Sequence, residues 1–185
     1  GLLTSSGQTG WATVNGSDFA TYDPAVGVKA VSTIGFGAAG GSDNALLTTS
    51  DVITGSSNRT MASLKIAPLE SQRLDITGAG GLQTPAIMLT GGENFVIANT
   101  GVGTGGVDVA ATQHIYVQQA DLTISAPLTG SGSLVKSGAG TLILEGDNSY
   151  SGATTINEGQ LRATAASLGS GLLKFRGGVL EIAGG

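Results

Sequence analysis

The sequence is dominated by very short alternating segments, in which two apolar residues flank one residue that can face water. Glycine-rich tracts such as residues 78–81, 91–94 and 101–106 separate these segments. Alternation with a period of two predicts half-buried β-strands, and glycine admits the positive φ angles of tight turns. The pattern therefore predicts an all-β fold. The segments are residues 64–66, 74–76, 87–89, 95–97, 107–109, 115–117, 122–124, 142–144 and 180–182.

The spacing of the segments selects one all-β architecture. Starts at residues 74, 95, 115 and 134 are 21, 20 and 19 residues apart, which is close to one coil of a β-solenoid. A β-sandwich would need longer strands, typically about five to six residues, and hairpin signals between them. We therefore predict a right-handed parallel β-helix with about 20 to 25 residues per coil and about seven to nine coils.

Composition excludes several other classes. Glycine accounts for 32 of the 185 residues and charged residues for 11%, so helices with charged outer faces are not expected. Hydrophobic residues make up 40%, which is too many for a disordered chain. The net charge of −5, with scattered Lys and Arg, argues against nucleic acid or an anionic membrane as a partner.

Processing and membrane signals are also absent from the sequence. No apolar run approaches the length of about 18 residues that a membrane span requires, so we expect no membrane insertion of this segment. Residues 1–3 lack the features of a signal peptide, which predicts a mature or excised segment. The chain has no cysteine, so disulfides and cysteine-based sites are excluded.

Residues 1–60 are less regular, and we predict that they form an irregular N-terminal coil or cap ahead of a β-helix over residues 61–185. Aromatic residues gather in the first part of the chain, at Trp11, Phe19, Tyr22 and Phe36. Capping or core packing is the favoured interpretation of these side chains, because aromatic residues in so aromatic-poor a chain are most often structural. A recognition patch built from Trp11 and Tyr22 is the alternative.

Residues 130–161 carry the most specific pattern in the chain. The stretch resembles the autotransporter-associated β-strand repeat found in the passenger domains of Gram-negative surface proteins. The resemblance implies a secreted, β-helical part of a bacterial surface protein, located on the extracellular side of the outer membrane. The matching positions are Gly132, Leu134, Lys136, Gly138, Gly140, Thr141, Leu142, Leu144, Gly146, Asn148, Tyr150, Gly152, Thr155, Gly159 and Leu161.

The repeat can also be interpreted residue by residue. Leu142 and Leu144 are expected to point to the same side of a strand, and Asn148 to bond backbone groups at a bend. Tyr150 is expected to cap that bend. Lys136 interrupts the alternation, and we expect its amine to lie in water at a strand end or bulge.

The sequence predicts no catalytic or metal-binding residue and no cofactor. The carboxylates at Asp75, Asp108, Asp121, Glu145, Asp147 and Glu158 show no spacing that would pair them as a glycan-cleaving enzyme requires, so solvated turn carboxylates are expected. His114, the single histidine, is expected on the same outer face as Tyr116, without triad or metal partners. Residues 101–106 are expected to form a turn and not a phosphate loop, because no helix follows and no lysine accompanies them.

Three functional hypotheses follow. The leading one is a non-enzymatic structural or adhesive segment of a secreted β-helical surface protein. The second is a self-assembling extracellular fibre or surface layer, in which the chain associates with itself or with neighbouring coils of a longer chain. The third, an enzyme acting on glycans, needs a carboxylate cluster that the spacing does not produce. A surface or glycan ligand is compatible with the first hypothesis, but no residue pattern identifies it.

Overall fold

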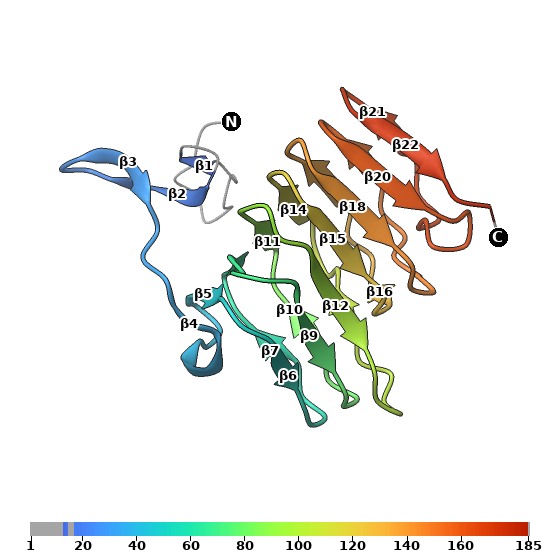
Figure 1. Cartoon of the computed structure of the whole chain (residues 1–185), viewed down its shortest axis with the longest axis horizontal. Coiled ribbons are helices and arrows are strands. Elements are labelled where there is room, and N and C mark those ends of the chain that lie inside the picture. The colour runs from blue at the N-terminus through green and yellow to red at the C-terminus, as the bar shows by residue number, and fades with distance from the viewer. Residues whose placement is uncertain (1–12, 15–16, 185) are drawn as a thin grey trace.

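The structure is a computed structural model that describes residues 13–14 and 17–184. Regular structure in these residues is almost entirely β-strand, and the exception is one turn of 3₁₀-helix, η1 (Phe36–Ala38). None of the described residues forms a helix long and apolar enough to cross a membrane. Parallel strands stacked along one axis make up most of the molecule (Figure 1).

Three parallel sheets form the body of the molecule. The eight-stranded sheet contains β4 (Ile34–Gly35), β5 (Asn44–Leu47), β8 (Ser63–Ile66), β11 (Ala86–Leu89), β14 (Gln113–Val117), β17 (Leu134–Ser137), β19 (Thr154–Ile156) and β21 (Leu173–Phe175). The seven-stranded sheet contains β6 (Asp51–Ile53), β9 (Gln72–Ile76), β12 (Phe95–Asn99), β15 (Asp121–Ile124), β18 (Thr141–Leu144), β20 (Gln160–Ala163) and β22 (Val179–Ile182). The four-stranded sheet contains β7 (Arg59–Thr60), β10 (Leu82–Gln83), β13 (Val107–Asp108) and β16 (Leu128–Thr129).

The chain alternates between the two large sheets and so winds into coils. Seven coils follow one another in the described residues, namely β5–β6, β8–β9, β11–β12, β14–β15, β17–β18, β19–β20 and β21–β22. Equivalent positions Leu64, Ile87 and Ile115 are 23 and 28 residues apart, whereas Lys136, Ile156 and Phe175 are 20 and 19 residues apart. The predicted β-solenoid is confirmed, and all nine predicted segments lie in or overlap strands.

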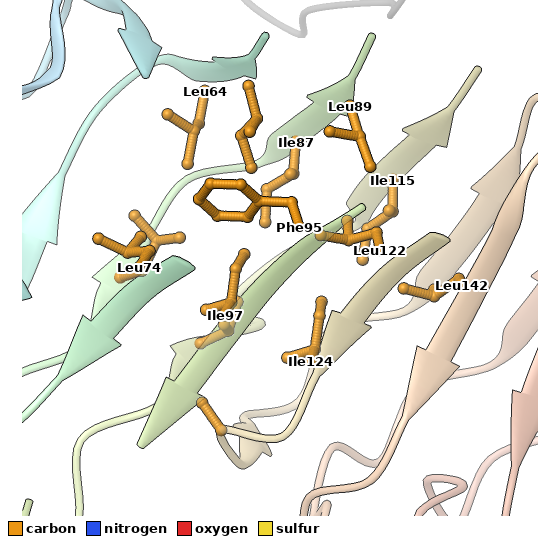
Figure 2. Close-up of a cluster of buried hydrophobic side chains, with 14 of the residues drawn as sticks. Leu64, Leu74, Ile87, Leu89, Phe95, Ile97, Ile115, Leu122, Ile124 and Leu142 are labelled. Atoms are coloured by element: carbon orange, nitrogen blue, oxygen red, sulfur yellow. The ribbon is translucent and has the colours of Figure 1, made fainter. Parts of the chain in front are cut away.

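The core is a set of apolar columns that run along the solenoid axis. Leu74, Ile97, Ile124 and Leu144 are in register on successive coils of the seven-stranded sheet, and each is at most 1% exposed. Figure 2 shows Phe95 among the leucine and isoleucine side chains of neighbouring coils. Full burial of one such side chain stabilises the fold by about 1.5–3 kcal/mol, so the stack gains stability from each added coil.

One glycine column fixes the turn between the two large sheets. Gly138, Gly159 and Gly178 occupy this turn in three successive coils, with φ angles of 81°, 68° and 67°. A Cβ atom on Gly159 would lie 2.3 Å from the carbonyl oxygen of Gly138, and one on Gly178 would lie 2.7 Å from that of Gly159. Both the left-handed backbone and the close approach of the coil below therefore require glycine here.

A separate antiparallel sheet lies against the eight-stranded sheet. It consists of β1 (Thr13–Val14), β2 (Asp18–Asp23) and β3 (Gly27–Ala30). Phe19 packs with Ala86 and Met88, and Asp18 forms an ion pair with Lys65. This contact explains why Met88, the middle residue of a predicted alternating segment, is buried instead of facing water.

Phe36 packs into the core at the start of the stack. Phe36 is 4% exposed and joins the main core, with the Arg59 guanidinium 5.2 Å from its ring centroid. The packing interpretation therefore holds for Phe19 and Phe36, whereas Trp11 lies outside the described residues and the recognition patch stays a prediction. Regular parallel coils already include β5 and β6, so the stack begins before residue 61.

Candidate functional site

The repeat segment, residues 134–163, comprises β17, β18, β19 and β20, which form two successive coils in the regular part of the stack. Leu142 and Leu144 point into the core, and Ile143 between them is half-buried on the outer face, as the alternation predicts. The strands pair in parallel with the coils on both sides. The repeat is therefore an integral part of the solenoid and spans two successive coils.

Lys136 contradicts the expectation that its amine lies in water. The side chain is 0% exposed and points inward, in register with Ile115 below and Ile156 above. Alternation continues through the residue, so it is neither a bulge nor a strand end, and the fold buries the charge at a core position.

Carbonyl oxygens of the turn and of the next coil surround the Lys136 amine. Its Nζ atom donates to the carbonyl oxygens of Ser137 (3.0 Å), Gly138 (2.7 Å) and Glu158 (3.2 Å). Loss of water around the amine lowers the pKa of Lys136 to about 8, and the charge of Glu158 opposes this shift. The buried Lys136 amine therefore links its own turn to the following coil. Its three hydrogen bonds partly compensate for the lost contact with water.

Asn148 bonds backbone groups of both neighbouring coils, as expected. Its Oδ1 atom accepts a hydrogen bond from the Leu128 amide at 2.7 Å, and its Nδ2 atom donates to the Ser167 carbonyl at 2.5 Å. The backbone of this segment also continues the ladder of the four-stranded sheet, because the Ser149 amide donates to the Leu128 carbonyl. Asn148 thus holds three successive coils together where no regular strand forms.

Tyr150 lies inside the stack. The side chain is 0% exposed, and its hydroxyl lies 2.7 Å from Oγ1 of Thr154. A Cβ atom on Gly169 in the next coil would approach the tyrosine ring to 2.5 Å. The tyrosine therefore fills a space that glycine in the following coil leaves open.

The carboxylates named from the sequence are spread over different sheets and turns. Asp75 on β9 accepts hydrogen bonds from Arg73, and Asp108 on β13 accepts one from Gln83. Glu145, Asp147 and Glu158 are exposed or partly exposed, and Asp121 is half-buried. The described residues contain no group of three or more His, Asp or Glu side chains that could hold a metal ion.

His114 lies on the outer face of β14, as does Tyr116. Both line a small cavity of about 60 Å³ together with Phe19 and Ser137, at the contact with the antiparallel sheet. Burial lowers the pKa of His114. The histidine thus belongs to the packing interface between the two parts of the fold.

Comparison with known proteins agrees with the repeat geometry. Residues 134–163 match the family model of the passenger-associated-transport-repeat. The chain is 39% identical over 99 residues to the adhesin BmaC autotransporter of Brucella suis biovar 1, a match that covers 52% of this chain and 3% of that protein. No solved structure matches the chain. The predicted resemblance is confirmed, and the chain carries the repeat of autotransporter passengers within a parallel β-solenoid.

Proposed function

We propose that the chain is a non-enzymatic, adhesive segment of a secreted bacterial surface protein, in which stacked coils hold binding surfaces away from the cell. The observation that carries this proposal is the passenger-associated repeat, built into two successive coils of a continuous solenoid in a chain similar to an adhesin autotransporter. Lys136 and Asn148 hydrogen-bond to neighbouring coils, and Tyr150 packs against Gly169 of the next coil, which is a structural role. Function as a stalk requires such coil-to-coil contacts.

Adhesion can be tested with beads coated with the purified chain. We expect these beads to bind cultured animal cells above the level of beads coated with the heat-unfolded chain. Equal binding by both preparations would contradict an adhesive role for the folded surface. In the same preparation, release of sugars from a panel of polysaccharides would contradict the non-enzymatic part of the proposal.

The same proposal places the segment outside the outer membrane. Protease added to intact bacteria that express the natural protein should then remove the segment, while a periplasmic marker stays intact. Protection of the segment until the outer membrane is broken would contradict this location.

A further inference from the structure

An elongated groove opens on the outside of the solenoid where the four-stranded sheet leads into the eight-stranded sheet. Its volume is about 340 Å³, within the range of about 300–1,000 Å³ typical of small-molecule sites. The walls come from four successive coils, which at about 4.8 Å per coil gives a length of about 14 Å along the axis. The main lining segments are residues 60–62, 83–85 and 108–113.

One polar side chain of the groove lacks a hydrogen-bond partner. Gln113, the first residue of β14, is 1% exposed, and its Nε2 atom makes no hydrogen bond with any described residue. Its backbone amide, by contrast, donates to the Ser133 carbonyl at 2.7 Å. Native folds seldom bury an unsatisfied amide, because it loses its hydrogen bonds to water without replacement. The Gln113 amide therefore leaves a donor unsatisfied in the buried part of the groove wall.

A row of linked polar side chains borders the same groove. Thr60 donates to Oε1 of Gln83 at 3.1 Å, and Nε2 of Gln83 donates to Oδ2 of Asp108 at 2.8 Å. Asn58 adds a longer hydrogen bond of 3.4 Å to the same oxygen. These contacts fix the carboxylate of Asp108, while its Oδ1 atom accepts no hydrogen bond from the described residues. The row therefore presents an oriented acceptor to hydroxyl groups.

The rest of the lining excludes two ligand classes. None of the described lining residues is Lys or Arg, so an anionic ligand would meet Asp108 without a compensating charge. An extended peptide would need a free strand edge, but the neighbouring backbone amides of Leu82 and Val107 already donate to Gly106 and Pro127 of the next coil. Recognition at the groove must therefore use side chains.

The remaining chemistry fits one class of ligand. The groove combines an acceptor for hydroxyl groups at Asp108, a donor for a carbonyl group at Gln113, and small apolar wall residues such as Pro85 and Val109. An N-acetylated sugar carries hydroxyls, a carbonyl and a methyl group within one ring unit. We propose that the groove binds a neutral oligosaccharide that contains N-acetylated sugar units.

Calorimetric titration with two matched sugars tests the ligand class. Triacetylchitotriose and cellotriose share the same linkage, and they differ in whether an acetamido group or a hydroxyl stands at the second carbon of each ring. We expect triacetylchitotriose to bind at least about tenfold more tightly, the ratio that corresponds to one hydrogen bond. Failure of both sugars to bind at millimolar concentration, or equal binding of the two, would overturn the proposal.

Variants test the location of the site. Gln113→Leu removes the unpaired amide and Asp108→Asn removes the carboxylate charge, and each should weaken triacetylchitotriose binding at least about tenfold. Gln113→Leu should also raise the denaturation midpoint, because an unsatisfied amide leaves the interior. Gln72→Leu is the control, since Oε1 of Gln72 is also unpaired but lies outside the groove. Unchanged binding in both groove variants would overturn the proposal.

The inference rests on the adhesive function proposed above and gives it a ligand, but the two can fail separately. Beads coated with Gln113→Leu should lose binding to cells if the groove mediates adhesion. Normal adhesion by Gln113→Leu and Asp108→Asn beads would overturn the groove as the adhesive site and leave the adhesive function standing. Sugar binding by a chain whose beads do not adhere would support the groove and contradict the adhesive function.

Discussion

Replacement of Lys136 by methionine tests how the repeat segment carries a buried amine. Methionine has a similar length and no charge, so Lys136→Met keeps the volume of the side chain and removes the ammonium group. The three carbonyl oxygens that accept from Nζ then lose their donor. At neutral pH these two effects oppose each other, so the pH dependence of stability is more informative than its value at one pH.

The magnitude follows from the pKa of Lys136, which burial lowers from 10.5 to about 8. One pKa unit corresponds to about 1.4 kcal/mol, so the folded state disfavours the charged amine by about 3 kcal/mol relative to the unfolded chain. Between pH 8 and 10.5 the unfolded chain binds one more proton at this site than the folded chain. The free energy of unfolding contributed by Lys136 therefore rises with pH across this window and falls as the pH drops to about 8.

Equilibrium denaturation at intervals from pH 7 to pH 11, for the natural sequence and for Lys136→Met, isolates this contribution. Other titrating groups affect both chains and cancel in the difference. We expect the free energy of unfolding of the natural sequence to gain about 3 kcal/mol over that of the variant across the window.

Lys174→Met is the matched control, because Lys174 is exposed on β21. It shows how much of the difference comes from the loss of any exposed lysine charge. A flat difference for Lys136→Met would show that the Lys136 amine keeps its ordinary pKa and reaches water. A difference that falls with pH would show that the charge of Glu158 outweighs burial. Either result would refute the conclusion that burial lowers the pKa of Lys136.

Three further substitutions test the coil contacts, with circular dichroism and denaturation midpoints as readouts. Leu144→Asp should prevent folding, because an unpaired carboxylate would replace a side chain in an apolar column; a folded variant with a midpoint like the natural one would contradict the column. Gly159→Ala should destabilise the fold by more than about 1 kcal/mol, since φ is positive and the Gly138 oxygen lies within the new contact distance; Gly92→Ala, where a Cβ atom meets nothing within 4 Å, should have little effect. Asn148→Ala should cost about 1–3 kcal/mol through the lost bridges to two coils, and an unchanged midpoint would contradict this role.

The fold was predictable because two of its periods are visible in the sequence. Alternation within segments such as 122–124 identifies the inward residues, and the spacing of about 20 residues identifies the coil. The first signal depends only on neighbours in the same strand, and the second depends only on regular repetition along the chain. The four-stranded sheet gave this signal of alternation only at residues 107–109, since each of its strands has two residues and alternation is hard to recognise over that length.

The wrong prediction for the Lys136 amine has a different cause. Its position two residues after Leu134 puts it on the inward side, but the charge of lysine favours water unless partners are present. The partners are carbonyl oxygens of residues 137, 138 and 158, which only the stacked coils bring together. Gln113 was missed for a related reason, because an unpaired amide can be recognised only when every neighbouring donor and acceptor is known.

The repeat residues and the groove residues lie in different regions of the solenoid, and sequence change has different effects in each region. In the repeat segment, Lys136, Asn148 and Tyr150 all form contacts within or between coils, so substitutions there affect the stack itself. The groove residues lie in earlier coils, including the 28-residue step from Ile87 to Ile115, and Nε2 of Gln113 has no hydrogen-bond partner there. Sequence change at Gln113 can therefore alter binding with little effect on the coil contacts, whereas Gln83 and Asp108 also link successive coils. A β-solenoid can in this way keep one coil repeat for assembly while neighbouring coils acquire a ligand.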